Sequence, residues 1–309
     1  MERLLITLIL VCTMNNITNA QNPFYGQYHT PHETVPFDRI ETEHYEPAIL
    51  EGIKLQNAEI EAIIQNPEKA DFTNTIEAFE ESGELLDKVV AVFGNMLSAE
   101  TNDDLQELAQ KIMPLLSEHS NNITLNKKLF ARVKEVYNQK ETLQLTQEQK
   151  QLLENAYNSF IRHGSNLEGE AREEYRRLTT ELSKLTLTFS ENNLKETNAY
   201  QMLLTKKESL AGLPEIIIEA AAETAKNEEK EGWAFTLHAP SYIPFMTYSD
   251  NRDLRQKLYM AYNTKCTHDN EFNNIDIVKK IANTRMKIAQ LLGYKDYAEY
   301  TLKKRMAEN

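Results

Sequence analysis

The chain has 309 residues, with 47 acidic and 34 basic side chains and a formal net charge of −13 at pH 7. An acidic surface repels nucleic-acid phosphates and anionic membranes, so neither is expected as a partner. The hydrophobic content of 41% is ample for a core and glycines are few, which predicts a mainly α-helical globular protein of one or two domains.

Residues 1–20 have the pattern of an export signal. Arg3 is the only basic residue ahead of an apolar run over residues 4–14, and small residues that suit a cleavage site follow. The apolar run is too short to span a bilayer as a permanent helix. Cleavage would remove Cys12 and leave Cys266 alone, so no internal disulfide is expected. We therefore expect an exported protein, either periplasmic, in the cell envelope or secreted.

Residues 21–197 are expected to form an N-terminal helical domain. It opens with an extended, proline- and aromatic-rich segment over residues 21–42. Each later helix start is predicted from a residue that can cap the first turn or occupy its first position, with apolar residues at helical spacing behind it. These starts are Pro47, Asn74 with Glu77, Asn102, Asn126, and Thr146 with Gln149.

Two features of this domain predict close helix packing. Gly83 lies in the middle of the helix expected after Asn74, where a missing side chain suits contact with a neighbouring helix. From Leu167 to Phe189, apolar residues recur three and four positions apart. This spacing is typical of a long helix packed almost parallel to a neighbour.

Residues 198–309 are expected to begin a second domain. Strand-like segments near 199–205 and 233–238 are expected to pair and to enclose a helix over residues 214–225. Further helices are predicted over residues 275–292 and from about Lys295. The last four residues contain no capping glycine or polar tail, so we expect the chain to stop inside a helix, a sign of truncation.

The segment from Trp233 to Tyr262 combines a strand, two prolines and a helix start. Its alternating residues predict one buried face, formed by Trp233, Phe235 and Leu237. Pro240 and Pro244 have no N–H to donate, so they should end the ladder of hydrogen bonds. A cap cluster at residues 249–251 then begins a helix.

The same segment resembles a known family. Residues 233–255 read W-x-x-T-L-x-x-P-S-Y-x-P-x-M-x-Y-S-D-N-R-x-L-R, which is similar to the zinc metallopeptidase family of thimet oligopeptidase, oligopeptidase A and bacterial peptidyl-dipeptidase (dipeptidyl carboxypeptidase). Residues 74–89 (NTIEAFEESGELLDKV) and 288–307 (IAQLLGYKDYAEYTLKKRMA) carry the same resemblance. The resemblance covers residues 22–309 and is strongest to the peptidyl-dipeptidase branch. It extends only to the front part of these enzymes, which are about twice this long.

The resemblance implies a fold and a chemistry. Helical walls would enclose a deep channel that admits short peptides, and this chain would supply much of one wall. The family's zinc is bound by H-E-x-x-H on a helix, whose glutamate activates the attacking water. The one His-Glu pair here, His32 and Glu33, is followed by Thr-Val-Pro and lacks the second histidine. We therefore expect zinc in the full-length enzyme and no catalytic or zinc-binding residue in this chain, which would need a C-terminal catalytic half as its partner.

Other candidate sites are weaker. Histidines and one glutamate crowd the opening segment and could form a loose metal site, although exposed loop side chains are the simpler interpretation; they are His29, His32, Glu33 and His44. Cys266, His268 and Asp269 suggest a nucleophile and a base. A cysteine and a histidine two residues apart do not readily reach each other, so such a site would need partner residues from elsewhere in the fold. The other histidines, at positions 119, 163 and 238, are isolated. An aromatic patch suggests peptide binding or core packing, and its members are Tyr242, Phe245 and Tyr248.

Two functional hypotheses follow. The chain is either the front part of an exported zinc peptidase that releases C-terminal dipeptides from oligopeptides, or a non-catalytic helical protein that holds peptides or acts as a scaffold. The residues that would bind a peptide are not identified by the sequence.

Overall fold

The computed structural model describes residues 22–307, so the predicted export signal lies outside the described residues. Internal contacts divide the chain into two units, one of residues up to 183 and from 287 onward, the other of residues 184–286. Two helices, α8 (Gly169–Ala199) and α12 (Ile275–Leu291), contribute to both. The predicted start of a second domain at residue 198 stays a prediction.

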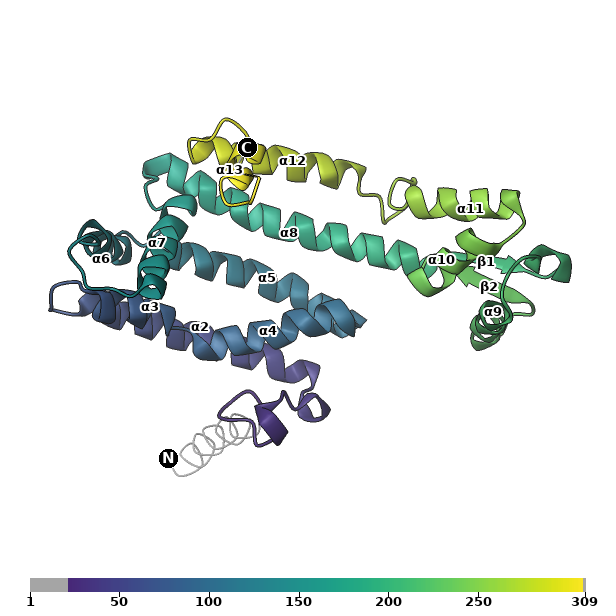
Figure 1. Ribbon diagram of the computed structural model, residues 1–309, viewed down its shortest axis with the longest axis horizontal. Coiled ribbons are helices and arrows are strands. Elements are labelled where there is room, and N and C mark those ends of the chain that lie inside the picture. The colour runs from purple at the N-terminus through teal and green to yellow at the C-terminus, as the bar shows by residue number, and fades with distance from the viewer. Residues whose placement is uncertain (1–21, 308–309) are drawn as a thin grey trace, which may run out of the picture. The chain divides into compact units, whose positions relative to one another are not determined.

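The fold is mainly α-helical with one small sheet, as predicted (Figure 1). The remaining helices of the first unit are α2 (Thr42–Gln65), α3 (Ala78–Glu80), α4 (Glu84–Ala99), α5 (Asp103–Thr124), α6 (Lys127–Asn138), α7 (Gln147–Arg162) and α13 (Tyr297–Leu302). The second unit contains β1 (Gln201–Leu204), α9 (Glu215–Asn227), β2 (Trp233–Thr236), α10 (Ala239–Tyr248) and α11 (Arg252–Asn263). Within the described residues, no helix is long and apolar enough to cross a membrane.

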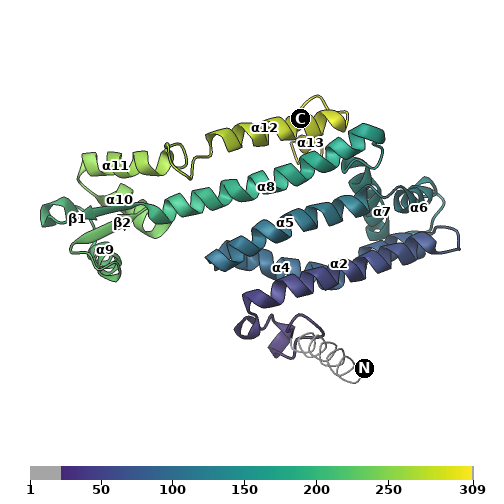
Figure 2. The ribbon, with the colours of Figure 1, turned by 180° about the vertical axis from the view of Figure 1, so that it is seen from behind.

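In the first unit, α2 packs along α4 and also contacts α5, and the three run side by side in both views (Figures 1 and 2). A core of aliphatic and aromatic side chains joins α2, α6 and α7; its most buried members are Ile76, Leu129, Val133, Val136, Leu153 and Phe160. The opening segment is held by Phe24, which is fully buried and packs on Tyr45 of α2 with ring centroids 5.3 Å apart.

Most of the predicted caps are confirmed. The side chains of Asn102, Asn126 and Thr146 each accept a backbone N–H from the first turn of α5, α6 and α7. Gln149 completes the capping box of α7, because its Oε1 accepts the backbone N–H of Thr146 at 3.1 Å. Local hydrogen bonding therefore fixed these helix starts.

Two predicted helix starts in the first unit are wrong. The first helix starts at Thr42 instead of Pro47, because the N–H of Glu41 donates to Nδ1 of His44 at 2.9 Å and caps an earlier turn. Asn74 does not start the next one, since it lies in a π-helical turn over Phe72–Glu77 that is capped by Asp71. The long helix predicted from the spacing between Leu167 and Phe189 is present as α8, which begins at Gly169.

Gly83 caps the start of α4 instead of lying within a helix. Its φ of +88° is in the left-handed region, which interrupts the predicted helix between α3 and α4. The expected close contact is present: a Cβ at this position would lie 2.3 Å from Nε2 of Gln56 on α2. The N–H of Gly83 also donates to Glu59 of α2 at 2.8 Å. The break therefore arises from close contact with α2.

In the second unit, β1 and β2 pair antiparallel with Met202 opposite Phe235, and α9 lies between them in sequence, as predicted. The strands are shorter than the predicted segments. Ala234 is also buried, so the expectation that β2 buries only one face is wrong. The strand is followed by α10, a helix that the two prolines had not indicated; Pro240 fits its second position, where no N–H bond is needed.

The last predicted helices are present with one correction. α12 ends at Leu291, ahead of Gly293 with its φ of +83°, and Asp296 caps α13 by accepting the N–H of Glu299 at 2.9 Å. α13 ends at Leu302 and residues 303–307 are not helical, so the expectation that the helix continues through them is wrong; residues 308 and 309 lie outside the described residues.

Candidate functional site

A polar cluster in the second unit joins α8 to the loop over residues 264–274. Glu196 of α8 accepts on both carboxylate oxygens: Oε1 lies 2.6 Å from Nδ1 of His268, and Oε2 accepts the backbone N–H of Cys266. Its side chain is only 12% exposed. The cluster therefore joins residues about seventy positions apart, a relationship that no local sequence pattern indicates.

Further hydrogen bonds hold both ends of this loop on α8. Lys265 donates to Oγ1 of Thr197 at 3.0 Å. Asn274 donates to the carbonyl of Phe189 at 3.0 Å and accepts from the side chain of Asn192 at 2.9 Å. The loop is thus a fixed part of the second unit, and its side chains have defined partners.

The electrostatics of the cluster argue against a cysteine nucleophile. Burial raises the pKa of the Cys266 thiol to about 11, and the adjacent Glu196 carboxylate adds to the increase. Burial would also raise the pKa of Glu196, but hydrogen bonds from His268 and Cys266 outweigh it and lower that pKa overall. The imidazole of His268 therefore pairs with a carboxylate, the thiol stays protonated near neutral pH, and the exposed Asp269 has no part in the cluster.

A pocket of about 480 Å³ lies beside the cluster. Its apolar lining comes from the residues that follow α8 and β2 and from α11, and its polar lining from α8 and the loop. The apolar residues are Tyr200, Leu237, Met260 and Ala261, and the polar ones are Glu196, Thr264, Thr267 and His268. Such a mixed lining can hold a small group with one apolar and one polar end. The sequence analysis missed Glu196, because only the fold brings it to His268.

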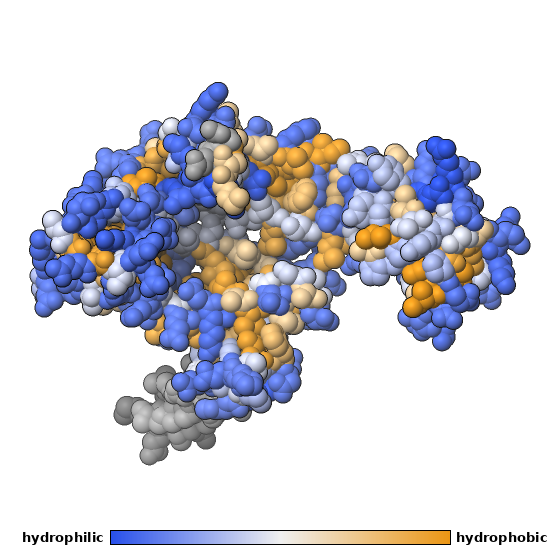
Figure 3. All heavy atoms as spheres, viewed as in Figure 1, coloured by the Kyte–Doolittle hydropathy of each residue, from blue (hydrophilic) through white to orange (hydrophobic). Residues whose placement is uncertain are grey.

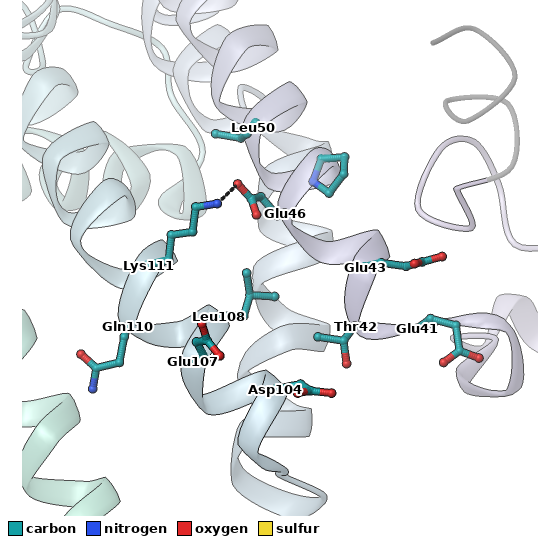
Figure 4. A pocket seen from close by; sticks show the side chains of 11 residues that line it. Glu41, Thr42, Glu43, Glu46, Leu50, Asp104, Glu107, Leu108, Gln110 and Lys111 are labelled. Carbon is teal, nitrogen blue, oxygen red and sulfur yellow. Dashed lines mark ion pairs between the residues drawn. The ribbon is translucent and has the colours of Figure 1, made fainter. Parts of the chain in front are cut away.

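A larger pocket, of about 1300 Å³, lies in the first unit between the start of α2 and the first half of α5 (Figure 4). Its lining is strongly acidic, with Glu41, Glu43, Glu46, Asp104 and Glu107. Lys111 of α5 points toward Glu46 of α2, and Nζ lies 2.5 Å from Oε1 (Figure 4). The remaining carboxylates give this pocket a negative potential that favours cationic groups.

The histidines of the opening segment are not assembled into a metal site. His29, His32 and Glu33 are exposed, and Nδ1 of His44 accepts the N–H of Glu41. Among residues 22–307, no group of three or more His, Cys, Asp or Glu side chains is placed to hold a metal ion.

The three isolated histidines have structural contacts. Nε2 of the buried His119 lies 2.7 Å from Oε1 of Gln56, and burial lowers its pKa. His163, at the end of α7, bonds to the carbonyl of Ser159, and His238, ahead of α10, contacts Asn198 and Thr236.

The aromatic patch is divided by the fold. Phe245 is fully buried and packs edge-on against Phe235, which is the core interpretation. Tyr242 stacks on Tyr262 of α11 with ring centroids 4.2 Å apart. Tyr248 is 52% exposed. These rings therefore do not form one binding surface.

Comparisons with known proteins place these elements in context. Residues 245–309 match the model of peptidase family M3. The chain is 35% identical to dipeptidyl carboxypeptidase of Escherichia coli K12 over 290 residues, which are 94% of this chain and 43% of the relative. It is 30% identical to oligopeptidase A of Salmonella typhimurium over 292 residues, or 93% of this chain and 42% of that relative. The resemblance noted in the sequence is thus confirmed, and the chain spans less than half the length of these curated relatives.

Proposed function

Because most of its length is related to peptidases of the M3 family, we propose that this chain is the front part of an exported zinc metallopeptidase resembling peptidyl-dipeptidases. The whole enzyme would release C-terminal dipeptides from oligopeptides. The observation that carries this proposal is the 35% identity to a dipeptidyl carboxypeptidase over 94% of the chain. Similarity at that level over nearly three hundred residues, together with the helical fold, supports a shared architecture.

The family uses zinc, but the described residues do not fit a zinc ion, since no three possible ligands converge among them and His44 and His119 are held in other hydrogen bonds. We therefore derive no catalytic step from these residues. The zinc ligands and the water-activating glutamate would come from the part of the relatives that has no counterpart here.

Export is the second element of the proposal, and the pattern of residues 1–20 supports it. N-terminal sequencing of the native protein would test it, with Gln21 expected as the first residue. A native protein that retains Met1, or starts beyond the apolar run at another site, would count against this cleavage.

The enzyme proposal is tested on the native polypeptide. An antibody against the chain should detect a species of roughly twice its 35.7 kDa, scaled from the relatives' length. That species, once purified, should release dipeptides from an N-blocked tetrapeptide, lose activity with a chelator and regain it with zinc. The recombinant 309-residue chain is the control and should be inactive.

A band at or just below 35.7 kDa would favour the second hypothesis, a non-catalytic peptide-binding or scaffold protein. The observation that favours this alternative is that each unit has a core of its own. Isothermal titration of the chain with mixed tetra- to octapeptides would then distinguish a peptide-binding protein from a scaffold.

A further inference from the structure

The pocket beside the Glu196 cluster has a polar lining on one side and an apolar lining on the other. In the space-filling view, hydrophobic residues of the second unit lie in small groups between polar ones (Figure 3). The pocket belongs entirely to this unit, and its volume of about 480 Å³ lies in the range of small-ligand pockets. The chemistry of its lining indicates which ligand would fit.

The side-chain hydrogens of the polar lining already have acceptors. The hydroxyl of Thr264 donates to the carbonyl of Met260 at 2.7 Å, and the hydroxyl of Thr267 donates to the carbonyl of Thr264 at 2.7 Å. Nδ1 of His268 lies 2.6 Å from Oε1 of Glu196, and because an ionised carboxylate can only accept, this nitrogen carries a hydrogen. The polar side chains are therefore left with lone pairs, which call for a ligand that donates.

The remaining nitrogen of His268 is also an acceptor when the imidazole is neutral. Nε2 lies 3.3 Å from Oγ1 of Thr264, whose hydrogen points to Met260, so Nε2 receives no hydrogen from that hydroxyl. Tyr200 lines the same pocket, and its buried hydroxyl, which has no hydrogen-bond partner among the described residues, can accept as well as donate.

The charge of the polar lining favours a cation. Burial acts to raise the pKa of Glu196, but the hydrogen bonds from His268 and Cys266 lower it overall, so the carboxylate is ionised near neutral pH. The ammonium group of Lys265 does not fill the pocket, because it donates to Thr197 and the residue does not line the pocket. A primary ammonium group from a ligand would supply three donors, no acceptor and one positive charge.

The apolar lining determines what must lie beside that ammonium group. Leu237, Met260 and Ala261 offer contacts to an aliphatic group but no side-chain hydrogen bond. Resting on the proposed function for the identity of the ligand, we propose that this pocket binds the amino terminus of an oligopeptide whose first side chain is apolar. The peptidase would thus hold its substrate at the end opposite the C-terminal dipeptide that it releases.

The test follows small probes on the 309-residue chain at about pH 7, where an ordinary imidazole is mostly neutral and an ordinary α-amino group mostly protonated. Leucinamide has the ammonium group and the apolar side chain, and ligand-observed NMR should give a Kd on the order of 1 mM. N-acetylleucinamide has no ammonium group and should bind at least about tenfold more weakly. Nα-acetyllysinamide carries its ammonium group on a flexible chain, which loses rotamer freedom on binding, and should also bind more weakly than leucinamide.

Substitutions at two lining residues locate the site. Met260→Lys adds a second cation, Glu196→Gln removes the negative charge, and each should weaken leucinamide binding about fivefold or more. The matched control is Tyr259→Lys, because Tyr259 and Met260 are both 50% exposed, but Tyr259 lies about 100° away around α11 and does not line the pocket. This control should change the affinity less than about twofold, since a charge directed into solvent is screened. Thermal melting of each variant would establish that it still folds.

Three outcomes would overturn the pocket as an ammonium site: no binding of leucinamide, equal binding of N-acetylleucinamide, or equal effects of Met260→Lys and Tyr259→Lys. Binding of Nα-acetyllysinamide as tight as that of leucinamide would overturn the assignment to a peptide amino terminus and identify a lysine side chain as the ligand.

This test is independent of the enzyme assay. The N-blocked tetrapeptide of that assay has no ammonium group at its start, so zinc-dependent dipeptide release without leucinamide binding would remove the pocket alone. Leucinamide binding by the chain, without dipeptide release by the native protein, would remove the enzyme proposal and keep the pocket.

Discussion

Nδ1 of His268 lies 2.6 Å from Oε1 of Glu196, and the other oxygen of that carboxylate accepts the backbone N–H of Cys266. One largely covered side chain, 12% exposed, therefore satisfies a loop backbone and an imidazole together. Loss of a buried hydrogen-bond acceptor with a charge costs more than a surface contact, because the groups left behind stay unpaired. The stability of the loop over residues 264–274 should depend on Glu196.

Replacement of Glu196 by glutamine tests this dependence. The amide keeps one acceptor oxygen and places an NH2 group against a donor, so Glu196→Gln should lower the free energy of unfolding by about 1–3 kcal/mol in urea titrations. Glu173→Gln, at an exposed position of the same helix α8, is the matched control and should stay within about 0.5 kcal/mol. Equal effects of the two substitutions would mean that the cluster contributes little.

The acid response of the two proteins should also differ. The hydrogen bonds from His268 and Cys266 lower the pKa of Glu196 below its ordinary value of 4.5, against the opposing effect of burial. A lowered native pKa stabilises the fold above pH 4.5 and this contribution disappears as the pH falls through the native pKa. Unfolding free energies measured from pH 6 to pH 3 should therefore fall more steeply for the unsubstituted chain than for Glu196→Gln. Parallel curves would contradict the lowered pKa.

Cys266 should behave as an inert thiol. Burial and the neighbouring Glu196 raise its pKa to about 11, and the residue is 4% exposed. In a chain without Cys12, a disulfide reagent at pH 8 should modify Cys266 only slowly, and fully after addition of denaturant. Glu196→Gln should speed the reaction because the loop opens more readily. Rapid modification of the folded unsubstituted chain would restore the nucleophile hypothesis.

The sequence predicted most of this fold because most of its helices are fixed by local hydrogen bonds. Asn102, Asn126 and Thr146 cap the helices that they were expected to cap, and the strand pairing around α9 follows from two short apolar runs. The errors arise where contacts distant in sequence determine the backbone. Gly83 breaks a helix because Glu59 and Gln56 of α2 lie against it, and no periodicity reports such a contact.

The candidate site was predicted less well for the same reason. Cys266 and His268 were singled out by type, but their shared partner Glu196 is about seventy residues away, and only the fold brings them together. The division of the aromatic patch likewise depends on whether each ring faces the core, as Phe245 does.

His119 provides a second pH-dependent contribution, in the first unit. Burial lowers its pKa from the ordinary 6.5, so the neutral imidazole is favoured in the folded state. This contribution is present above pH 6.5 and is lost as the pH falls toward the native pKa. His119→Gln can still donate to Gln56 and should flatten the fall in stability between pH 7 and pH 5, measured by urea unfolding. The control is His163→Gln, at an exposed position. If His163→Gln flattens the pH dependence of the unfolding free energy equally, the burial of His119 is not its cause.

Two glycines in the packed pair α2 and α4 should respond oppositely to alanine. A Cβ on Gly52 of α2 would lie 2.9 Å from the backbone Cα of Leu86, so Gly52→Ala must push the helices apart and should destabilise the chain by about 1–3 kcal/mol. Gly94 is exposed within α4, and a Cβ there meets nothing within 4 Å. Gly94→Ala should therefore stabilise the chain by about 0.5–1 kcal/mol through the lower backbone entropy of the unfolded state. Urea titrations of both variants check the pair. Tolerance of Gly52→Ala would mean that α2 and α4 do not approach as closely as this packing requires, and destabilisation by Gly94→Ala would mean that position 94 is not open to solvent.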